Sequence, residues 1–256
     1  MLTNGPVTQS RQERLQICDD IAARLHEVYG ERILAIGVYG SMARGTDGPF
    51  SDIEMLCVLS ETDEPVDYSY EWSAGPWKAE VNVLRADLLL DMAATVEGDW
   101  PLTHGPYFSQ RSLYDPHSFF PRLQAAAESP TPQQFKAAIE AVLVGEMYEF
   151  IGKLRNAGYH GPATYLPYLA MEFAQYGAML VGLHHRAIFS TGAMVLPEAS
   201  QLPDRPEGLD EVMRMTMSGE LSEPAAIVSA CERLWSGLVK WAGEHSYKIR
   251  SARIPF

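Results

Sequence analysis

The chain has few cysteines, little positive charge and no long apolar run, and each shortage excludes a class of protein. Its 256 residues include three cysteines, Cys18, Cys57 and Cys231, which are widely spaced and odd in number. This spacing argues against a disulfide framework or a cysteine-rich zinc site and predicts buried thiols in a reducing compartment. No apolar run is long enough to span a membrane, and no segment at the N-terminus reads as a signal peptide. We therefore expect a soluble, cytoplasmic protein without a membrane partner.

Positive charge is scarce as well. Lysine and arginine total 20, against 33 aspartates and glutamates, which gives a formal net charge of −13. A surface of this sign repels a nucleic-acid backbone and suits a polycationic small molecule, so we expect no nucleic-acid partner. Hydrophobic residues make up 46% of the chain, which supports a substantial core and argues against disorder.

Two neighbouring carboxylates mark the most informative part of the sequence. Asp52 and Glu54 stand at the start of an apolar run over 53–59, which is predicted to be a strand. Side chains two apart on a strand share a face, so the two carboxylates point the same way and repel each other. A divalent metal ion is the natural compensation, and Mg²⁺ prefers one or two carboxylates together with phosphate oxygens.

The segment just upstream has features of a phosphate site. Gly40 permits close approach of a backbone, Ser41 offers a hydroxyl at the start of a short helix, and Arg44 carries a fork of donors. The segment is not a Walker A loop, because no Gly-Lys-Ser/Thr closes it. Gly-Ser alone would indicate a tight turn, and Asp-x-Glu alone a solvated strand edge. Together they predict that Asp52 and Glu54 bind Mg²⁺, while Ser41, Arg44 and Ser51 hold a nucleoside triphosphate.

This combination resembles the nucleotidyltransferase superfamily that includes DNA polymerase β, whose mark is Gly-Ser followed by Asp-x-Asp/Glu. More narrowly, the chain is similar to the aminoglycoside 4′-O-nucleotidyltransferases of the kanamycin nucleotidyltransferase type. The stretches that carry the resemblance lie in both halves of the chain: 37–55, 71–72, 77–82, 99–105, 177–186 and 253–256. Because the resemblance spans the chain, it is much more specific than the short motif.

The first half of the chain has the pattern of a mixed α/β unit. Ser10 and Glu13 form a capping box for a helix over 10–29, whose apolar side is Leu15, Cys18, Ile21, Leu25 and Val28. Strands are predicted at 33–39, 52–59 and 77–84, a helix at 86–96, and loops at 61–69 and 97–111. In the third strand Lys78, Glu80 and Asn82 share a polar face that is able to meet Asp52 and Glu54.

The pattern becomes mainly helical from about residue 118. Thr131, Pro132 and Gln134 open a long helix that is predicted to reach about Asn156. Further helices are predicted over about 162–185, 207–217 and 223–243. The fold class is therefore α+β. We expect a nucleotidyltransferase domain over 1–127, with a mixed sheet and flanking helices, and a C-terminal helical bundle over 128–256.

Glu149 and Lys153 lie four residues apart on the long helix, so they face the same way. By themselves they indicate a surface ion pair, although the apolar residues around them suggest a face that is not fully exposed. The resemblance implies that Glu149 is the general base and Lys153 a nucleotide-phosphate contact. A partly desolvated carboxylate beside the acceptor hydroxyl would have its pKa raised towards the working pH. Glu80, beside the metal pair, is the alternative base.

The resemblance also implies a polycationic acceptor held by carboxylates. Glu71, Glu80, Asp99 and Glu146, with Lys78 beside them, are the expected substrate contacts. Gly145 departs from the family pattern, because the kanamycin enzyme has a carboxylate at this position. This difference affects the expected substrate specificity and not the expected reaction. The adjacent His184 and His185 point in different directions on a helix, so we expect a structural role for them and not a chelating pair.

The resemblance finally implies a homodimer whose active sites are shared between the subunits. The expected reaction is transfer of AMP, or another nucleoside monophosphate, to the 4′-hydroxyl of kanamycin-type antibiotics. Two alternatives remain open. The chain is either a nucleotidyltransferase with another hydroxyl acceptor, such as a lincosamide or a protein, or a non-catalytic protein that binds polycations.

Overall fold

A computed structural model describes residues 5–60, 67–73, 77–159, 161–250 and 254. The chain forms two compact units. The first contains residues 1–95 and 104–130, and the second contains residues 96–103 and 131–256. Each unit is described by itself.

The first unit is built on a mixed five-stranded sheet with the strand order β3-β4-β2-β1-β5. β2 and β4 are parallel, and the other neighbouring strands are antiparallel. The strands are β1 (Ile33–Val38), β2 (Ile53–Leu59), β3 (Asp67–Ser73), β4 (Lys78–Arg85) and β5 (Arg111–Tyr114). The helical segments are α1 (Arg11–Tyr29), η1 (Gly30–Arg32), α2 (Gly40–Arg44), α3 (Ala86–Ala93), α5 (Gly105–Phe108) and α6 (Phe119–Glu128).

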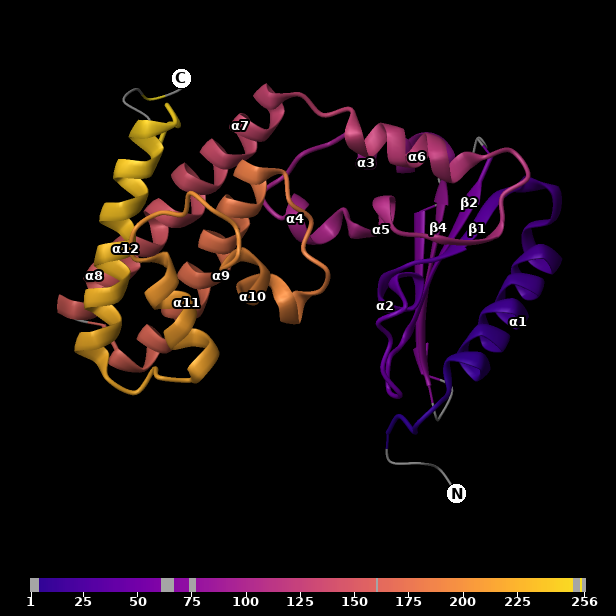
Figure 1. Cartoon of the computed structure of the whole chain (residues 1–256), viewed down its shortest axis with the longest axis horizontal. Coiled ribbons are helices and arrows are strands. Elements are labelled where there is room, and N and C mark those ends of the chain that lie inside the picture. Colours follow the sequence, from indigo (N-terminus) through magenta and orange to yellow (C-terminus); the bar gives the residue numbers. More distant parts are fainter. Residues whose placement is uncertain (1–4, 61–66, 74–76, 160, 251–253, 255–256) are drawn as a thin grey trace. The chain divides into compact units, whose positions relative to one another are not determined.

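Two hydrophobic clusters cover the two faces of this sheet. On one face, alternate residues of β2 such as Met55 and Cys57 pack with Cys18 and Leu25 of α1, which lies along the sheet in Figure 1. On the other face, Leu56 and its neighbours pack with residues of α3 and α6. Glu54 belongs to this second face by alternation, so it lies on the face that α3 and α6 cover farther along the strands.

Helix α1 begins as predicted, and most of its expected apolar side faces the core. The Ser10 hydroxyl accepts a hydrogen bond from the Glu13 backbone, and the Glu13 carboxylate accepts one from the Ser10 backbone. The buried residues include Arg14, whereas Val28 is 57% exposed. Cys18 and Leu25 are buried, and Leu15 and Ile21 pack against the same cluster, so the predicted apolar side is wrong only at Val28. The additional residue, Arg14, is buried through ion pairing with Asp47.

The predicted loops contain regular structure. The segment 61–69 was expected to be a loop, but Asp67–Ser69 belong to β3; residues 61–66 lie outside the described residues. The segment 97–111 contains the short helices α4 (Trp100–Thr103) and α5, and its last residue begins β5. β3 and β5 are the edge strands of the sheet, and their exposed residues leave little hydrophobic periodicity to detect.

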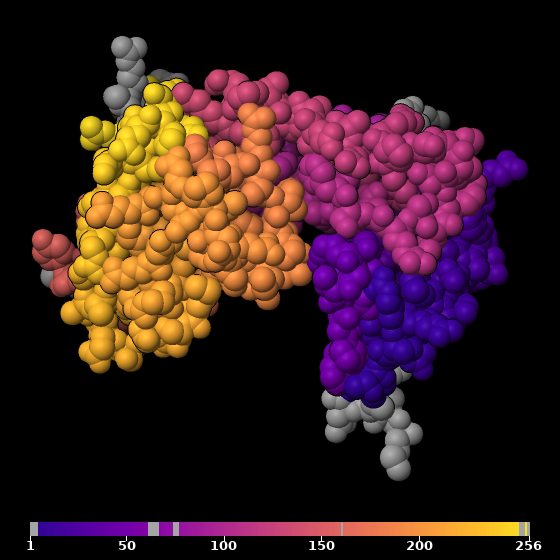
Figure 2. Space-filling model, in the orientation of Figure 1, coloured from indigo at the N-terminus to yellow at the C-terminus, as the bar shows by residue number. Residues whose placement is uncertain are grey.

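The second unit is helical. Its cysteine, Cys231, is free and buried, as are Cys18 and Cys57 in the first unit, which confirms the prediction of buried thiols. In the space-filling view the orange and yellow segments of α9 to α12 pack against one another (Figure 2). Among the described residues, no helix is long and apolar enough to cross a membrane. The segments are α4, α7 (Pro132–Val142), η2 (Leu143–Met147), α8 (Tyr148–Tyr159), η3 (Ala163–Tyr165), α9 (Leu166–His185), η4 (Gly192–Met194), α10 (Val195–Ala199), α11 (Leu209–Ser218) and α12 (Pro224–Glu244).

The predicted long helix over 131–156 is not uniform. Its capping box at Thr131 and Gln134 is present, but one π-helical turn, Leu143–Met147, separates α7 from α8. Such turns are rare and often occur at functional sites. Gly145 and Glu146 both lie in this turn, which the regular helical periodicity of the sequence does not predict.

Candidate active site

Three glutamates form a row across neighbouring strands of the first unit. Glu54 on β2 is paired in register with Glu80 on β4, and Glu80 is paired with Glu71 on β3. Residues directly opposite one another on neighbouring strands point to the same face. The predicted polar face of residues 78–82 therefore does meet Glu54. We call Glu54, Glu80 and Glu71 the carboxylate row.

Glu54 is the most confined member of the carboxylate row. Burial raises its pKa, and the neighbouring charges of Asp52 and Glu80 raise it further. Gly40 lies directly against it, since a Cβ built on this glycine would be 1.7 Å from Glu54 Oε2. Gly40 also has a φ of +66°, a conformation that side chains other than glycine rarely adopt. The sequence around Gly40 is thus shaped to bring a backbone turn onto a carboxylate.

Two residues fix the position of Glu80: Asn82 of the predicted polar face, and Tyr39, which the sequence analysis did not single out. Asn82 Nδ2 donates hydrogen bonds to Glu80 Oε1 at 2.7 Å and to the Tyr39 hydroxyl oxygen at 2.8 Å. The Tyr39 hydroxyl in turn lies 3.4 Å from Glu80 Oε1, and the Tyr39 backbone N–H donates to the Glu54 carbonyl at 2.9 Å. Burial and the charges of Glu80 and Glu54 raise the pKa of Tyr39, so it remains a neutral donor. The tyrosine therefore connects the turn at Gly40 to the carboxylate row.

The predicted phosphate contacts lie around the same turn. Ser41 and Arg44 are in α2, and the charge of Arg44 acts on Glu54. Arg44 Nε is buried and has no hydrogen-bond partner among the residues that the structure describes. Ser51 accepts a hydrogen bond from the Gly48 backbone at 2.9 Å, and it lines a pocket of about 260 Å³ together with Asp52 and Lys78.

Lys78 is held at the outer end of the carboxylate row. Its Nζ is 3.3 Å from Glu71 Oε1, and both side chains are about half exposed. The hydrogen bond and charge of Glu71 raise the pKa of Lys78, with smaller contributions from Asp52 and Glu80. A single lysine thus faces several carboxylates, which leaves excess negative charge at this place.

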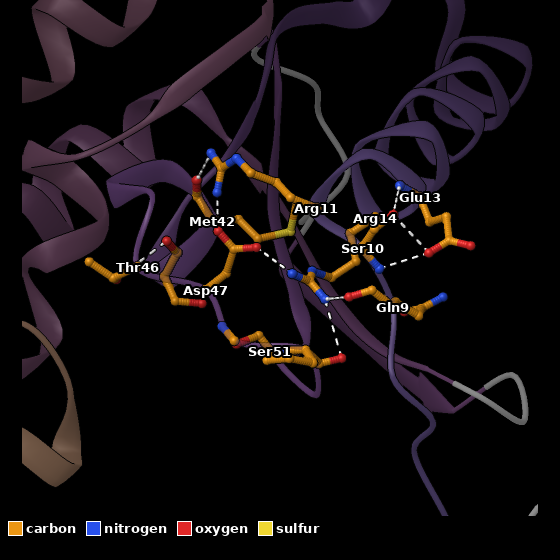
Figure 3. A network of polar contacts seen from close by, with 12 residues as sticks. Gln9, Ser10, Arg11, Glu13, Arg14, Met42, Thr46, Asp47 and Ser51 are labelled. Carbon is orange, nitrogen blue, oxygen red and sulfur yellow. Dashed lines mark hydrogen bonds and ion pairs between the residues drawn. The ribbon is translucent and has the colours of Figure 1, made fainter.

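A buried ion-pair network fastens the loop between α2 and β2 to helix α1 (Figure 3). Asp47 pairs with both Arg11 and Arg14, and the side chains of Arg14 and Asp47 are each 2% exposed. Arg11 Nη2 also donates to the Met42 carbonyl at 2.7 Å, and Arg14 Nη1 donates to the Gln9 carbonyl at 2.8 Å. Burial alone would raise the pKa of Asp47, but the two arginines outweigh it and lower this pKa. The network positions the loop that delivers Ser51 and Asp52, and an arginine in an otherwise apolar helix face was its only sequence signal.

The remaining predicted residues belong to the second unit. Asp99 and Glu146 line the same cavity, of about 570 Å³, together with Glu97, Glu172 and Tyr176. The described lining residues include no lysine, arginine or histidine. Burial raises the pKa of Tyr176, and the charges of Glu146, Glu172 and Asp99 raise it further. Glu172, which sequence analysis missed, adds a further carboxylate to the cavity that Glu146 lines. Glu146 lies in the same π-helical turn as Gly145.

Glu149 and Lys153 form an ion pair at 2.5 Å on α8. Their side chains are 57% and 41% exposed, so the face is not fully exposed, as expected, but both groups still reach solvent. The hydrogen bond from Lys153 to Glu149 is the main cause of the raised pKa of Lys153. The geometry of the pair is that of an ordinary i, i+4 pair, and its exposure leaves both side chains accessible to a ligand or another chain.

Comparison with known proteins decides the family. Two curated proteins called aminoglycoside nucleotidyltransferase (4′), from Bacillus sp and Staphylococcus aureus, are each 45% identical to the chain over 254 residues. The matches cover 99% of this chain and 100% of each relative. The chain belongs to the aminoglycoside nucleotidyltransferase (4′) family. The KNTase C-terminal domain family also matches residues 117–248.

The fold of this family member agrees with that of a solved nucleotidyltransferase-like protein from Exiguobacterium sibiricum. The two share 12% sequence identity and a TM-score of 0.51, over 92% of this chain and 78% of the other. The α+β fold class is therefore confirmed, with a mixed sheet followed by a helical region. Members of this family use nucleoside triphosphates, so the nucleotide prediction is confirmed at that level.

Proposed function

We propose that the chain transfers a nucleoside monophosphate, AMP in the first instance, from a metal-bound triphosphate to the 4′-hydroxyl of kanamycin-type aminoglycosides. The similarity to the two 4′-nucleotidyltransferases over essentially the whole chain supports the reaction. The observation that carries the chemistry is the crowding of Asp52, Glu54 and Glu80 beside the turn at Gly40. Carboxylates so arranged repel one another, and a bound cation would relieve this repulsion and explain their close approach.

The residues present fit a magnesium ion. Burial raises the pKa of Glu54, and repulsion from Asp52 and Glu80 raises it further; a divalent cation would relieve this repulsion. Oxygen ligands of this kind suit Mg²⁺, and the proposed ligands are Asp52 and Glu54. When bound, the ion neutralises phosphate charge and orients the triphosphate for displacement of pyrophosphate.

Ser41, Arg44 and Ser51 are proposed to hold the triphosphate. The buried Arg44 Nε has no hydrogen-bond partner among the described residues, and a phosphate oxygen would satisfy it. Such contacts fix the α-phosphorus for in-line attack by the acceptor oxygen. The new oxygen–phosphorus bond forms as the bond to the pyrophosphate oxygen breaks, and positioning supplies much of the acceleration.

Glu149 is proposed as the base that takes the hydroxyl proton, and Lys153 as a phosphate contact. Because both are exposed, we propose that they act in a homodimer whose active sites contain residues of both subunits. The partner's surroundings would then desolvate Glu149, which favours proton transfer at neutral pH. Glu80 is the alternative base, because it adjoins Glu54.

The acceptor is proposed to be held by charge. In the first unit, Glu71 and Glu80 offer carboxylates, and Lys78 lies beside Glu71 as a further contact. In the second unit, Asp99 and Glu146 offer carboxylates. The ammonium groups of an aminoglycoside would form charge-assisted hydrogen bonds with them. The scarcity of positive charge along the whole chain favours the same kind of acceptor.

The test is Mg²⁺-dependent release of pyrophosphate from ATP with kanamycin, compared with a 4′-deoxy aminoglycoside. Release with kanamycin alone is expected. Release with both would move the target hydroxyl, and release only with a lincosamide or a protein acceptor would replace the substrate class. Binding of an aminoglycoside without any turnover, under conditions where MgATP binds, would favour the non-catalytic alternative.

A further inference from the structure

Three side chains with metal-binding atoms converge in the second unit, and none of them belongs to the candidate active site. They are His184, Asp204 and His245, and their ligand atoms all lie within 4.8 Å of one another. His184 Nε2 is 3.2 Å and His245 Nε2 is 3.0 Å from the same oxygen, Asp204 Oδ2. In a tetrahedral ion with bonds of about 2.0–2.1 Å, neighbouring ligand atoms are roughly 3.4 Å apart. The two measured separations are therefore close to those of a metal centre.

Each of the three residues comes from a different element. His184 lies in the last turn of α9, His245 is the C-cap of α12, and Asp204 lies between α10 and α11. His184 and His245 are 16% and 28% exposed, so the site is shielded and still open to solvent. An ion here would connect the ends of two long helices to a loop.

Surrounding hydrogen bonds fix the three residues. His184 Nδ1 is 2.8 Å from the Tyr247 hydroxyl, which leaves Nε2 directed at Asp204. Trp241 Nε1 donates to the Asp204 carbonyl at 3.1 Å, which holds the backbone behind the carboxylate. Hydrogen bonding of the second ring nitrogen is a regular feature of histidines that bind metals.

The charge around the three residues also suits a cation. Arg205, next to Asp204 in the chain, is engaged by Asp210 at 2.7 Å. His185 is not part of the set, because its Nε2 is 2.7 Å from the Pro203 carbonyl.

We propose that His184, Asp204 and His245 bind one divalent transition-metal ion, with Zn²⁺ the best match, and that the ion stabilises the helical unit. Two imidazoles and a carboxylate are a common set for such ions, with a further position left for water. His184 would then act with partners distant in sequence and not with the adjacent His185. This site is independent of the transferase reaction.

The test is a Co²⁺ titration of the full-length protein in excess Mg²⁺, followed by visible absorption, with Zn²⁺ added to displace the cobalt. The wild type is expected to bind one equivalent with the spectrum of a four- or five-coordinate ion. His245→Gln should weaken binding at least about 100-fold, and Tyr247→Phe by about 10-fold. His185→Gln, the matched control, should bind like the wild type.

Absence of a saturable signal in the wild type would overturn the proposal, and so would equal losses in His185→Gln and His245→Gln. The network would then be a hydrogen-bonded cluster only. If His245→Gln does not fold, Asp204→Asn replaces it, because the amide keeps the shape and loses the charge. Retention of wild-type affinity by a folded Asp204→Asn would also contradict the site.

Discussion

Two sets of acidic residues, one in each unit, are presented in opposite ways. In the first, strand register forces Glu54, Glu80 and Glu71 into one row, and Gly40 presses on Glu54. In the second, Glu149 stands on a helix surface, 57% exposed and paired with Lys153. Crowded carboxylates carry an electrostatic cost that a bound cation or a proton removes, whereas an exposed pair carries almost none. The surroundings within one chain therefore account for a ligand-binding role of the carboxylate row but not for a role of the Glu149–Lys153 pair. For this reason the proposed function includes a partner subunit.

The largest effect is expected from the crowded set. Asp52→Asn should lower kcat by about 1000-fold or more, because the loss of one ligand removes charge that stabilises the transition state. The midpoint of thermal unfolding should not fall. Steady-state pyrophosphate release measures the first quantity and calorimetry the second. Asp67→Asn, an exposed carboxylate at the start of β3, is the control and should retain activity; a fully active Asp52→Asn would remove the metal assignment.

The next largest effect is expected from the ion-pair network of Arg14 and Asp47, which positions the loop that carries Asp52. Arg14→Met should lower the free energy of unfolding by about 3–5 kcal/mol, because it leaves Asp47 buried without its main partner. Arg24→Met on the same helix breaks an exposed pair with Glu27 and should cost about 0.5 kcal/mol or less. Denaturant unfolding measures both. Equal losses of unfolding free energy in the two variants would show that burial does not strengthen the contribution of the network to stability.

The same network predicts a pH dependence. The folded-state pKa of Asp47 is lowered, so its stabilisation is present above the unfolded pKa of about 3.9 and is lost as pH falls through the folded value. The stability difference between wild type and Arg14→Met should therefore shrink in acid below about pH 4. A difference that stays constant down to pH 2 would contradict the ion pair as its cause.

Glu149→Gln addresses the exposed pair. It should lower kcat by about 100-fold if the glutamate is the base, with little change in stability. Glu220→Gln breaks a comparable exposed pair with Arg214 and is the matched control, expected to retain activity. If Glu149→Gln keeps full kcat while Glu80→Gln loses it, the base belongs to the first unit and the roles are reversed.

The smallest effect concerns stability without metal. The folded-state pKa of Glu54 is raised, so its ionised form costs stability at neutral pH, and this cost disappears as pH falls through the raised value. Glu54→Gln should thus raise the unfolding midpoint of the Mg²⁺-free protein by about 1–3 °C while abolishing activity. Added Mg²⁺ should stabilise only the wild type and reverse the order. Exposed Glu31→Gln is the control; a lowered midpoint for Glu54→Gln would contradict the crowding.

Sequence reasoning reached the parts of this site that periodicity and capping encode. The strands at Ile53–Leu59 and Lys78–Arg85 follow from alternation, and the meeting of Glu80 with Glu54 follows from their polar face. The edge strand β3 was missed, because its residues are exposed and carry no buried alternation. Glu71 was therefore identified from the resemblance alone, while its place in the carboxylate row required the register.

Long-range polar contacts were beyond sequence reasoning. Arg14 and Asp47 are 33 residues apart, and only the place of Arg14 on an apolar helix face distinguishes them from solvated charges. His184 and Asp204, or His184 and Tyr247, likewise meet only once helices have packed. The π-helical turn around Glu146 departs from the regular period on which helix prediction depends. Such contacts are products of tertiary packing, and residue type alone does not specify them.

The most direct test of the shared-site account is to mix the two inactive variants Asp52→Asn and Glu149→Gln after unfolding and refolding them together. If each active site takes Asp52 from one subunit and Glu149 from the other, a mixed dimer contains one intact site. Activity should then recover to about a quarter of the wild-type value, because random pairing makes half of the dimers mixed. No recovery, in a sample shown to contain mixed dimers, would place both residues in the site of one chain and contradict the account.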